Sequence, residues 1–321
     1  MKELKIVFMG TPAFALPSLD LLFASNHRIA ALVVPPDRPS GRGGKVRPVP
    51  AKEWALEKRV EVKQPEKITD RGFVSWLEAE KPDLIVTVAF GRILPPALLA
   101  LPRLGCINLH ASYLPYYRGA APIHRAVIEG AEYSGVSVIK MSPELDAGDI
   151  IMQEKENISP FDTAGMLHDR LALRGASLLL KAADALAEGT AAALPQDHDL
   201  ATYAPPLERQ DERLDWNCSA VEIYNRIRGL NPWPGAFTML EGMRLKVWRA
   251  ARPVPGGASS SRAAPGTILS VGEDSLIVAT ADLPLALLEL QPAGRKMMDA
   301  GSFCCGYRIE PGCFFGEEVR S

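Results

Sequence analysis

The sequence predicts an α/β protein in which a Rossmann-like parallel-sheet domain is followed by a smaller, OB-like β-barrel domain. The chain has 321 residues, which exceeds the usual size of a single domain. Apolar runs of strand length alternate with helical patterns through its first half, as they do where helices cover both faces of a parallel sheet. The last third holds short strand-like runs separated by Gly- and Pro-bearing turns, which is typical of small barrels.

The first domain is predicted from apolar runs that would form buried strands, at residues 4–9, 29–34, 84–89 and 135–141. The first run ends at Gly10-Thr11-Pro12, and a helix is expected to begin near Pro17. A longer helix is expected to follow Phe161-Asp162-Thr163, which can cap it, and to end near Gly189. Strands and helices in this alternation predict βαβ units.

The predicted domains are residues 1–189 and residues 207–321, joined by a linker at residues 190–206. The linker shows no periodicity and ends in two prolines. In the second domain a helix over residues 220–228 is expected to precede strands at residues 236–240, 245–248, 266–269, 275–279 and 285–290. The Gly- and Ser-rich stretch 253–265 is expected to be a surface insertion.

Composition excludes several classes of protein. The formal net charge is -2, so no global basic excess indicates a nucleic-acid or membrane partner. The five cysteines form no Cys-x-x-Cys pair, and their odd number favours reduced thiols over a disulfide framework. No His/Cys cluster has metal-ligand spacing, so no metal is expected. The N-terminal apolar run is too short for a signal segment and no run could span a membrane, so a cytoplasmic location is expected.

The central segment carries the residues with the clearest chemistry. Asn108 and His110 alternate with apolar residues, so a strand would place the amide and the imidazole on the same face. Such a pair can donate hydrogen bonds to one carbonyl oxygen as it becomes an oxyanion. Asp146 follows about 36 residues later, and a carboxylate beside an imidazole holds its tautomer and can accept a proton through water. Taken singly, His110 is more often a structural histidine and Asp146 a turn or cap residue.

These three residues lie in a series of motifs that resembles the folate-dependent formyltransferases. The series is Asn-x-His, then Ser112, Tyr113, Leu114 and Pro115, then Tyr117-Arg118-Gly119, and finally Leu145-Asp146-Ala147-Gly148-Asp149. The resemblance implies that Asn108, His110 and Asp146 carry formyl transfer from 10-formyltetrahydrofolate to an amine. It also implies folate contacts by residues 112–115, although Tyr113 stands where the family usually has Leu. The segment 88–95 resembles the family's pterin-pocket segment, which adds Phe90, Gly91 and Ile93 as folate-binding candidates.

Segments outside this series resemble the methionyl-tRNA formyltransferases. They span nearly the whole chain and lie at residues 8–15, 36–43, 119–125, 201–205, 231–236 and 288–292. This resemblance implies that the acceptor is the α-amino group of methionyl initiator tRNA, used in translation initiation, and that residues 207–321 bind tRNA. A monomer is expected. The Lys that usually follows Tyr-Ala-Pro in this family is Pro206 here.

A stretch with basic residues and no acidic ones runs from Arg38 to Lys52. Its Arg38, Arg42, Lys45 and Arg47 could contact tRNA phosphates, although charge runs of this kind are usually solvated surface loops. The resemblance favours tRNA contact, because the family wedges this loop against the acceptor arm and Arg42 matches the residue that does so. Gly44 replaces a lysine that is common there. Candidates for a further basic patch are Arg244, Lys246, Arg249, Arg295 and Lys296.

The sequence leaves other functions open. The same site could formylate a sugar-nucleotide amine or glycinamide ribonucleotide, or it could hydrolyse formyl-folate. The long second domain argues against the glycinamide acceptor. A non-catalytic RNA-binding protein that retains the scaffold is a further alternative, opposed by the intact Asn, His and Asp. A dinucleotide-dependent oxidoreductase is excluded, because Gly10-Thr11-Pro12 lacks the Gly-x-Gly-x-x-Gly cradle.

Overall fold

The computed structural model describes residues 2–40, 45–253 and 263–316, with only the backbone described at residues 39, 40, 45 and 46. The chain divides into two compact units. The first comprises Met1–Pro122, Ser134–Asn157 and His168–Ala204, and the second comprises Ile123–Tyr133, Ile158–Leu167 and Pro205–Ser321. Each unit is therefore assembled from three separate stretches of the chain.

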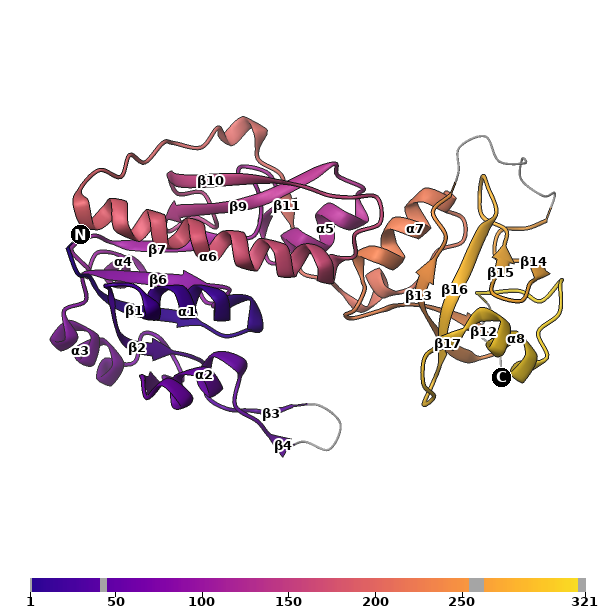
Figure 1. Cartoon of the computed structure of the whole chain (residues 1–321), viewed down its shortest axis with the longest axis horizontal. Coiled ribbons are helices and arrows are strands. Elements are labelled where there is room, and N and C mark those ends of the chain that lie inside the picture. The colour runs from indigo at the N-terminus through magenta and orange to yellow at the C-terminus, as the bar shows by residue number, and fades with distance from the viewer. Residues whose placement is uncertain (1, 41–44, 254–262, 317–321) are drawn as a thin grey trace. The chain divides into compact units, whose positions relative to one another are not determined.

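Within the described residues, the first unit is built on a seven-stranded sheet with the order β10-β9-β7-β6-β1-β2-β5 (Figure 1). The strands are β1 (Lys5–Gly10), β2 (Arg28–Val33), β5 (Glu61–Lys63), β6 (Leu84–Val88), β7 (Cys106–His110), β9 (Tyr133–Lys140) and β10 (Ile150–Asn157). Strands β5, β2, β1, β6 and β7 pair in parallel, whereas β9 pairs antiparallel to β7. The predicted parallel sheet is confirmed, and it continues into an antiparallel extension.

Helices cover the faces of this sheet. They are α1 (Leu16–Ala24), α2 (Pro50–Lys58), α3 (Arg71–Glu80), α4 (Pro96–Leu99) and α6 (Ala164–Glu188), whereas α5 (Pro122–Ile128) belongs, after Pro122, to the second unit. All five residues of β6 are buried, which explains its continuous apolar sequence. Helix α6 packs directly on β7, because a Cβ atom added at Gly175 would lie 2.8 Å from the Leu109 side chain.

The ends of α6 follow from local sequence, and the helix predicted there is confirmed. The Thr163 hydroxyl accepts a hydrogen bond from the Met166 backbone N–H at 3.2 Å, which satisfies one of the free donors of the first turn. At the other end Gly189 adopts a φ of +74°, the left-handed conformation that commonly terminates helices and that glycine adopts without strain.

The parallel strands bring three chain segments to one edge of the sheet. Strand β1 ends at Gly10, β6 at Val88 and β7 at His110, and strands that run in parallel have their carboxyl ends at the same edge. Ligands of open α/β sheets usually bind at this edge. A Cβ atom at Gly10 would lie 2.8 Å from the Val88 carbonyl oxygen, so only glycine permits this close approach of β1 to β6.

A short parallel ribbon lies outside the main sheet. Strand β8 (Arg118–Gly119) pairs with β11 (Tyr203–Ala204), and the Ala121 N–H donates to the Ala204 carbonyl at 3.1 Å. The segment between α6 and β11 also contains the short 3-10 helix η2 (His198–Leu200). Backbone pairing therefore ties this segment to the chain that follows His110.

The second unit is an antiparallel sheet. The strands are β12 (Ala236–Leu240), β13 (Met243–Ala250), β14 (Ile268–Val271), β15 (Leu276–Val278), β16 (Leu285–Pro292) and β17 (Met298–Asp299), in the order β12-β13-β16-β15-β14 with β17 beside β16. Bridges from Leu240 to Phe315 and from Thr267 to Phe314 join the β12 and β14 ends of this order through one short segment. The predicted barrel architecture is confirmed by this closure. Helices α7 (Ala220–Gly229) and α8 (Ala300–Tyr307) contribute to its core.

Candidate active site

Asn108 is oriented by a neighbouring strand. Thr87 on β6 stands directly opposite Asn108 in the parallel register, and its hydroxyl donates to Asn108 Oδ1 at 2.7 Å. With that oxygen occupied, the Asn108 NH2 group makes no hydrogen bond within the described residues. The amide is therefore held with its donor hydrogens available for an acceptor such as a carbonyl oxygen.

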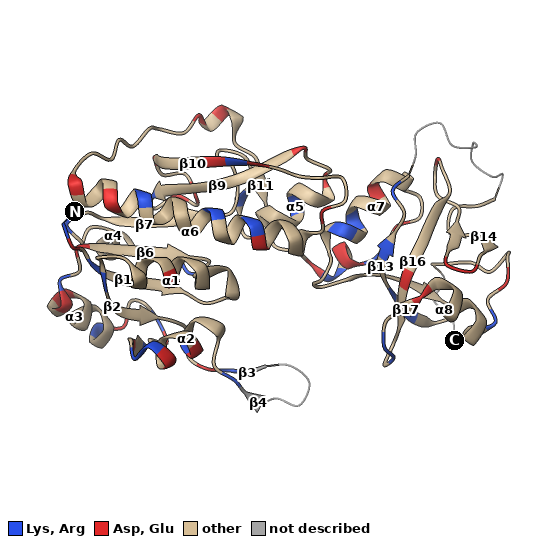
Figure 2. Cartoon of the chain, viewed as in Figure 1, with Lys and Arg blue, Asp and Glu red and all other residues tan. Residues whose placement is uncertain are grey.

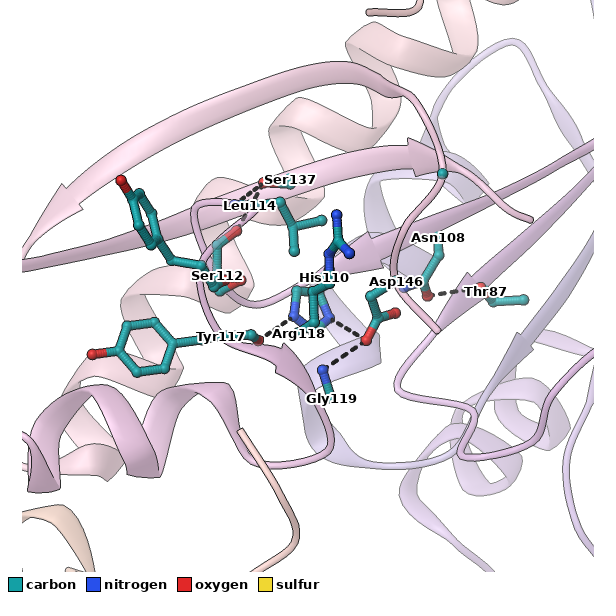
Figure 3. Close-up of polar contacts among 12 residues, drawn as sticks. Thr87, Asn108, His110, Ser112, Leu114, Tyr117, Arg118, Gly119, Ser137 and Asp146 are labelled. Carbon is teal, nitrogen blue, oxygen red and sulfur yellow. Dashed lines mark hydrogen bonds and ion pairs between the residues drawn. The ribbon is translucent and has the colours of Figure 1, made fainter. Parts of the chain in front are cut away.

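His110 lies between two acceptors (Figure 3). Its Nε2 is 2.9 Å from the Tyr117 carbonyl oxygen, and its Nδ1 is 3.6 Å from Asp146 Oδ2. A carbonyl can only accept, so Nε2 must carry a hydrogen, and a ring protonated on both nitrogens satisfies both neighbours. The distance from Nδ1 to Asp146 Oδ2 exceeds that of a hydrogen bond. An Nδ1–H is therefore attracted to the carboxylate electrostatically but can still donate to another acceptor.

The position of the Asp146 carboxylate depends on its own backbone conformation and on a hydrogen bond from the backbone of Gly119. Its φ of +50° lies in the left-handed region, which Asp tolerates better than most residues. Its Oδ2 accepts the Gly119 N–H at 2.9 Å, as Figure 3 shows. Gly119 must itself be glycine, because its φ is +117° and a Cβ atom would lie 2.8 Å from the Ala204 carbonyl oxygen. The glycine of the Tyr-Arg-Gly motif thus presents its N–H to the catalytic candidate.

The segment 112–115 forms a closed loop after β7. Ser112 is fully buried, and its hydroxyl donates to the Tyr116 carbonyl at 2.6 Å. Ser137 on β9 donates to the Ser112 carbonyl at 2.8 Å and accepts from the Leu114 N–H at 3.1 Å. Leu114 is buried, whereas Tyr113 and Pro115 are partly exposed. The side chains of this loop that a folate could reach are therefore those of Tyr113 and Pro115.

The predicted pterin-pocket residues follow β6 at the carboxyl edge. Phe90 is buried, whereas Gly91, with a φ of +72°, is exposed and Ile93 is 70 % exposed. Ala89, between β6 and Phe90, also has a positive φ of 48°. This turn redirects the chain at the edge where His110 lies, and it leaves Ile93 as an exposed apolar side chain.

Of the predicted tRNA-binding residues, Arg38 and Arg47 are exposed. They flank a two-stranded ribbon of β3 (Pro39–Ser40) and β4 (Lys45–Val46), so Lys45 opens β4. Arg42 and Gly44 lie outside the described residues. In the second unit, Arg244 pairs with Glu212 at 2.8 Å and Arg249 with Glu289 at 2.9 Å, so part of the charge of the proposed basic patch is neutralised. Arg295 and Lys296 are exposed.

Cys106 on β7 is the thiol nearest in sequence to the candidate residues. It is 2 % exposed, and burial raises the pKa of its thiol to about 12. A thiol with this pKa stays protonated near neutral pH, so Cys106 is not suited to attack an acyl group. The arrangement of amide, imidazole and carboxylate thus favours direct acyl transfer between two bound substrates.

Thr87 is the site residue that the sequence analysis missed. The sequence pattern places it only within the apolar run 84–89. The signal that could have revealed it is its hydroxyl, since Thr87 is the polar side chain in the otherwise aliphatic sequence Leu-Ile-Val-Thr-Val. Its partner on β7 could be recognised only once the register was known.

The described part of the chain offers neither a metal site nor a membrane-spanning helix. No group of three or more His, Cys, Asp or Glu side chains there could hold a metal ion. None of the described helices is both long and apolar enough to cross a bilayer.

Comparison with known families identifies the class of protein. A family model described as formyl transferase matches residues 4–183, and a model described as formyl transferase, C-terminal domain, matches residues 206–308. These matches show that the chain is a formyltransferase.

Individual relatives indicate which kind of formyltransferase the chain resembles. The chain is 49% identical to the methionyl-tRNA formyltransferase of Moorella thermoacetica, over 98% of this chain and 99% of that protein. It is 44% identical to the methionyl-tRNA formyltransferase of Bacillus subtilis, over 97% of this chain and 98% of that protein. The chain belongs to the methionyl-tRNA formyltransferase family.

Solved structures of more distant proteins share the fold. HypX from Aquifex aeolicus in complex with tetrahydrofolic acid matches with a TM-score of 0.61 at 16% identity, covering 98% of this chain and 51% of that chain. An N-formyltransferase from Helicobacter canadensis in complex with folinic acid and dTDP-3-aminofucose matches with a TM-score of 0.63 at 17% identity, covering 89% of this chain and 99% of that chain. Identities this low support the fold alone.

Proposed function

We propose that this enzyme transfers the formyl group of 10-formyltetrahydrofolate to the α-amino group of methionyl initiator tRNA. The observation that carries the proposal is the convergence of Asn108, His110 and Asp146 at the carboxyl edge of the sheet. The amine nitrogen attacks the formyl carbon and forms the new C–N bond. The resulting tetrahedral intermediate collapses with cleavage of the bond to N10, and the proton lost by the amine is returned to N10 of the leaving tetrahydrofolate.

Asn108 and His110 are proposed to stabilise the oxyanion. The free NH2 group of Asn108 donates to the formyl oxygen, and Thr87 prevents the amide from presenting its own oxygen there. The His110 Nδ1–H supplies the second donor, since its 3.6 Å separation from Asp146 leaves it available to share. Donors that are already oriented need no reorganisation as negative charge develops.

Asp146 is proposed to orient His110 and to take the proton from the attacking amine. Oδ2 faces His110 and accepts the Gly119 N–H. Oδ1 is then the oxygen left to receive the amine proton, directly or through one water molecule. The same carboxyl group can return this proton toward N10, so the transfer needs no other base.

We assign the two substrates to different parts of the chain. Residues 1–189 would bind folate. In the 112–115 loop, Tyr113 and Pro115 would contact it and the buried Ser112 and Leu114 would hold the loop in shape, while Phe90, Gly91 and Ile93 would line the pterin pocket. Arg38, Arg42, Lys45 and Arg47 would contact the tRNA acceptor arm, and residues 207–321 would contribute the remaining tRNA surface. The enzyme is proposed to act as a monomer in the cytoplasm.

Alanine variants test the chemical part of the proposal. Asn108→Ala removes one oxyanion donor and should lower kcat by about 10²–10³-fold, with little change in the KM for tRNA. His110→Ala and Asp146→Ala should lower kcat at least as strongly. Asn157→Ala, the same change at an exposed residue that ends β10, is the control and should retain wild-type kcat. Wild-type turnover in the three site variants would end the proposal.

The acceptor is tested separately with the wild-type enzyme. Formyl transfer from 10-formyltetrahydrofolate is followed with methionyl initiator tRNA or with an amino-sugar nucleotide as the acceptor. We expect turnover with the tRNA and none with the sugar nucleotide at equal concentration. Transfer to the sugar nucleotide alone would retain the chemistry and overturn the assigned acceptor.

A further inference from the structure

Gln196 is a buried residue in a segment that is otherwise mostly exposed. It is 5% exposed, whereas its neighbours Pro195 and Asp197 are both exposed. The segment has no periodicity that would predict a core position. A glutamine is usually a surface residue, so its burial here requires that its amide be fully hydrogen-bonded.

The Gln196 amide is saturated on both sides. Its Nε2 donates to the carbonyl oxygens of Asp146 at 2.8 Å and Gly148 at 2.7 Å. Its Oε1 accepts from Arg118 Nε at 3.1 Å and Arg118 Nη2 at 2.7 Å. The site requires two donor hydrogens for the two carbonyls and one acceptor oxygen for the guanidinium. Glutamine has these groups, whereas ionised glutamate has no donor.

Arg118 strengthens these contacts. It is 3% exposed, and among the described residues it forms no ion pair with a carboxylate. Its other close side-chain neighbour is His198 Nδ1, at 3.4 Å. A buried positive charge that binds the amide oxygen polarises the amide, which makes its N–H groups stronger donors. The charge of Arg118 is thus transmitted through Gln196 to the loop that carries Asp146.

The backbone of the loop at residues 146–148 is conformationally restricted. Asp146 is held at a φ of +50°, which is a strained conformation for a residue with a side chain. Gly148 is confined as well, since a Cβ atom there would lie 1.7 Å from the Lys140 carbonyl oxygen. The Asp146 side chain is tied to Gly119 N–H, while Gln196 ties down the backbone of the same residue.

We propose that Gln196 is a positioning residue that, together with Arg118, sets the Asp146 carboxylate against His110. The inference rests on the proposed catalytic role of Asp146. Rotation of the 146–148 backbone would move the carboxylate by an ångström or more, and a misplacement of that size can cost about 10²-fold in rate. The segment before β11 therefore contributes to catalysis without touching either substrate.

The sharpest variant is Gln196→Glu. It keeps the side-chain shape and strengthens the contact with Arg118, but it replaces both donors with an oxygen that faces two carbonyls. We expect kcat to fall by about 10- to 100-fold with the two KM values within about twofold of wild type. Gln196→Asn keeps the amide chemistry with one methylene fewer, and it should lose less. Asn157→Asp makes the same amide-to-carboxylate change at an exposed residue of the first unit and should leave kcat unchanged.

A double-mutant cycle with Asp146→Asn separates positioning from simple structural support. If Gln196 acts through Asp146, Gln196→Glu should cost several-fold less in the Asp146→Asn background than in wild type. All kcat values are taken per folded molecule, with the folded fraction from circular dichroism. If the Glu variant does not fold, the same cycle is measured with Gln196→Asn.

The outcomes distinguish the two proposals. An active-site role for Asp146 is lost if Asp146→Asn turns over at the wild-type rate, and the positioning role is lost with it. If Asp146→Asn is impaired, the positioning role alone is overturned by a wild-type kcat in both Gln196 variants. It is also overturned if the effects of Gln196→Glu and Asp146→Asn on kcat multiply as independent factors, because Gln196 would then act elsewhere.

Discussion

The side chain of Asn108 has its oxygen bound by Thr87, and its nitrogen has no partner within the described residues. Asp146 is divided in a similar way, since Oδ2 receives both Gly119 N–H and the approach of His110. Each candidate thus has one polar atom committed to the protein and another available to a substrate. This division lets the protein fix the direction of a group that must still react.

Thr87→Val tests this orientation at the scale of one residue. Valine has nearly the same shape and suits a strand, so the change removes the hydroxyl without opening a cavity. The Asn108 amide should then sample both orientations, and kcat should fall by about 3- to 10-fold, the equivalent of one net hydrogen bond. The KM for each substrate should stay near wild type in steady-state assays.

Thr238→Val is the matched control for that variant. Thr238 is also buried in a strand, and its hydroxyl is bonded to the Trp216 indole N–H at 3.0 Å in the second unit. This change should lower stability but leave kcat per folded molecule unaltered. Equal kcat in Thr87→Val and wild type would mean that Thr87 does not orient Asn108.

Part of the site can be predicted from the sequence. Alternation along residues 106–110 places Asn108 and His110 on one face of a strand, and the structure has that strand. The contacts from Thr87 and Gln196 could not be predicted in the same way, since they join residues 21 and 50 positions away from their partners. Such contacts depend on strand register and loop path, which local periodicity does not encode.

At the scale of elements, Asp83 joins the start of β6 to two neighbours. Its carboxylate accepts the Lys5 backbone N–H of β1 at 2.8 Å and the Arg103 guanidinium at 2.5 Å. Burial alone would raise the pKa of Asp83, but these hydrogen bonds outweigh it, and the pKa lies below its usual value. The ionised form is therefore the one that stabilises the fold.

Asp83→Asn should lower the free energy of unfolding by about 1–2 kcal/mol at neutral pH. Because the folded pKa is depressed, the stabilisation is fully present above the unfolded pKa of about 4 and is lost as pH falls through the folded pKa. Urea unfolding of both proteins should show a constant difference from pH 5 to 8 that shrinks below pH 4. The exposed Asp274→Asn should show none, and a difference for Asp83→Asn that persists at pH 2 would contradict this account.

Elements were predicted best where the pattern was long or had clear ends. The helix after Thr163 has a cap, an apolar face and a terminating glycine, and it is present as α6. The helices α2 and α3 were not predicted. Helix α2 is only nine residues long and buries just Ala51, Trp54 and Ala55, so its apolar signal is weak. The pairing of β11 with β8 joins two-residue strands, which leave no periodicity to detect.

At the scale of the whole molecule, charge does not identify the partner. Figure 2 shows basic and acidic residues interspersed along the elements, including α6, and the net charge is -2. Binding of a polyanion must therefore depend on a few local side chains. Lysine and arginine side chains that neutralise phosphates release counterions from the nucleic acid. The affinity for tRNA should therefore fall as the salt concentration rises, whereas the KM for folate should change much less.

Arg47→Ala should reduce the slope of log Kd for tRNA against log salt by about one, as expected for the loss of one phosphate contact. Arg38→Ala should act similarly. Filter binding at several salt concentrations measures this slope. Lys67→Ala removes an exposed charge outside the Arg38–Lys52 stretch and should leave it unchanged. Identical slopes in all four proteins would remove Arg38 and Arg47 from the tRNA surface.

The second unit includes two stretches that precede the main body of its sequence, and this limits where the gene can be recombined. His124 Nδ1 is 2.8 Å from the Gly229 carbonyl, Arg125 pairs with Asp211 at 2.7 Å, and the Tyr224 hydroxyl donates to the Pro160 carbonyl at 2.9 Å. A chimera joined at residue 206 would inherit these partners from different parents. Exchange between homologues should give a folded protein only when residues 123–133 and 158–167 are exchanged together with the C-terminal part. The unit that must come from one parent is therefore discontinuous in the gene.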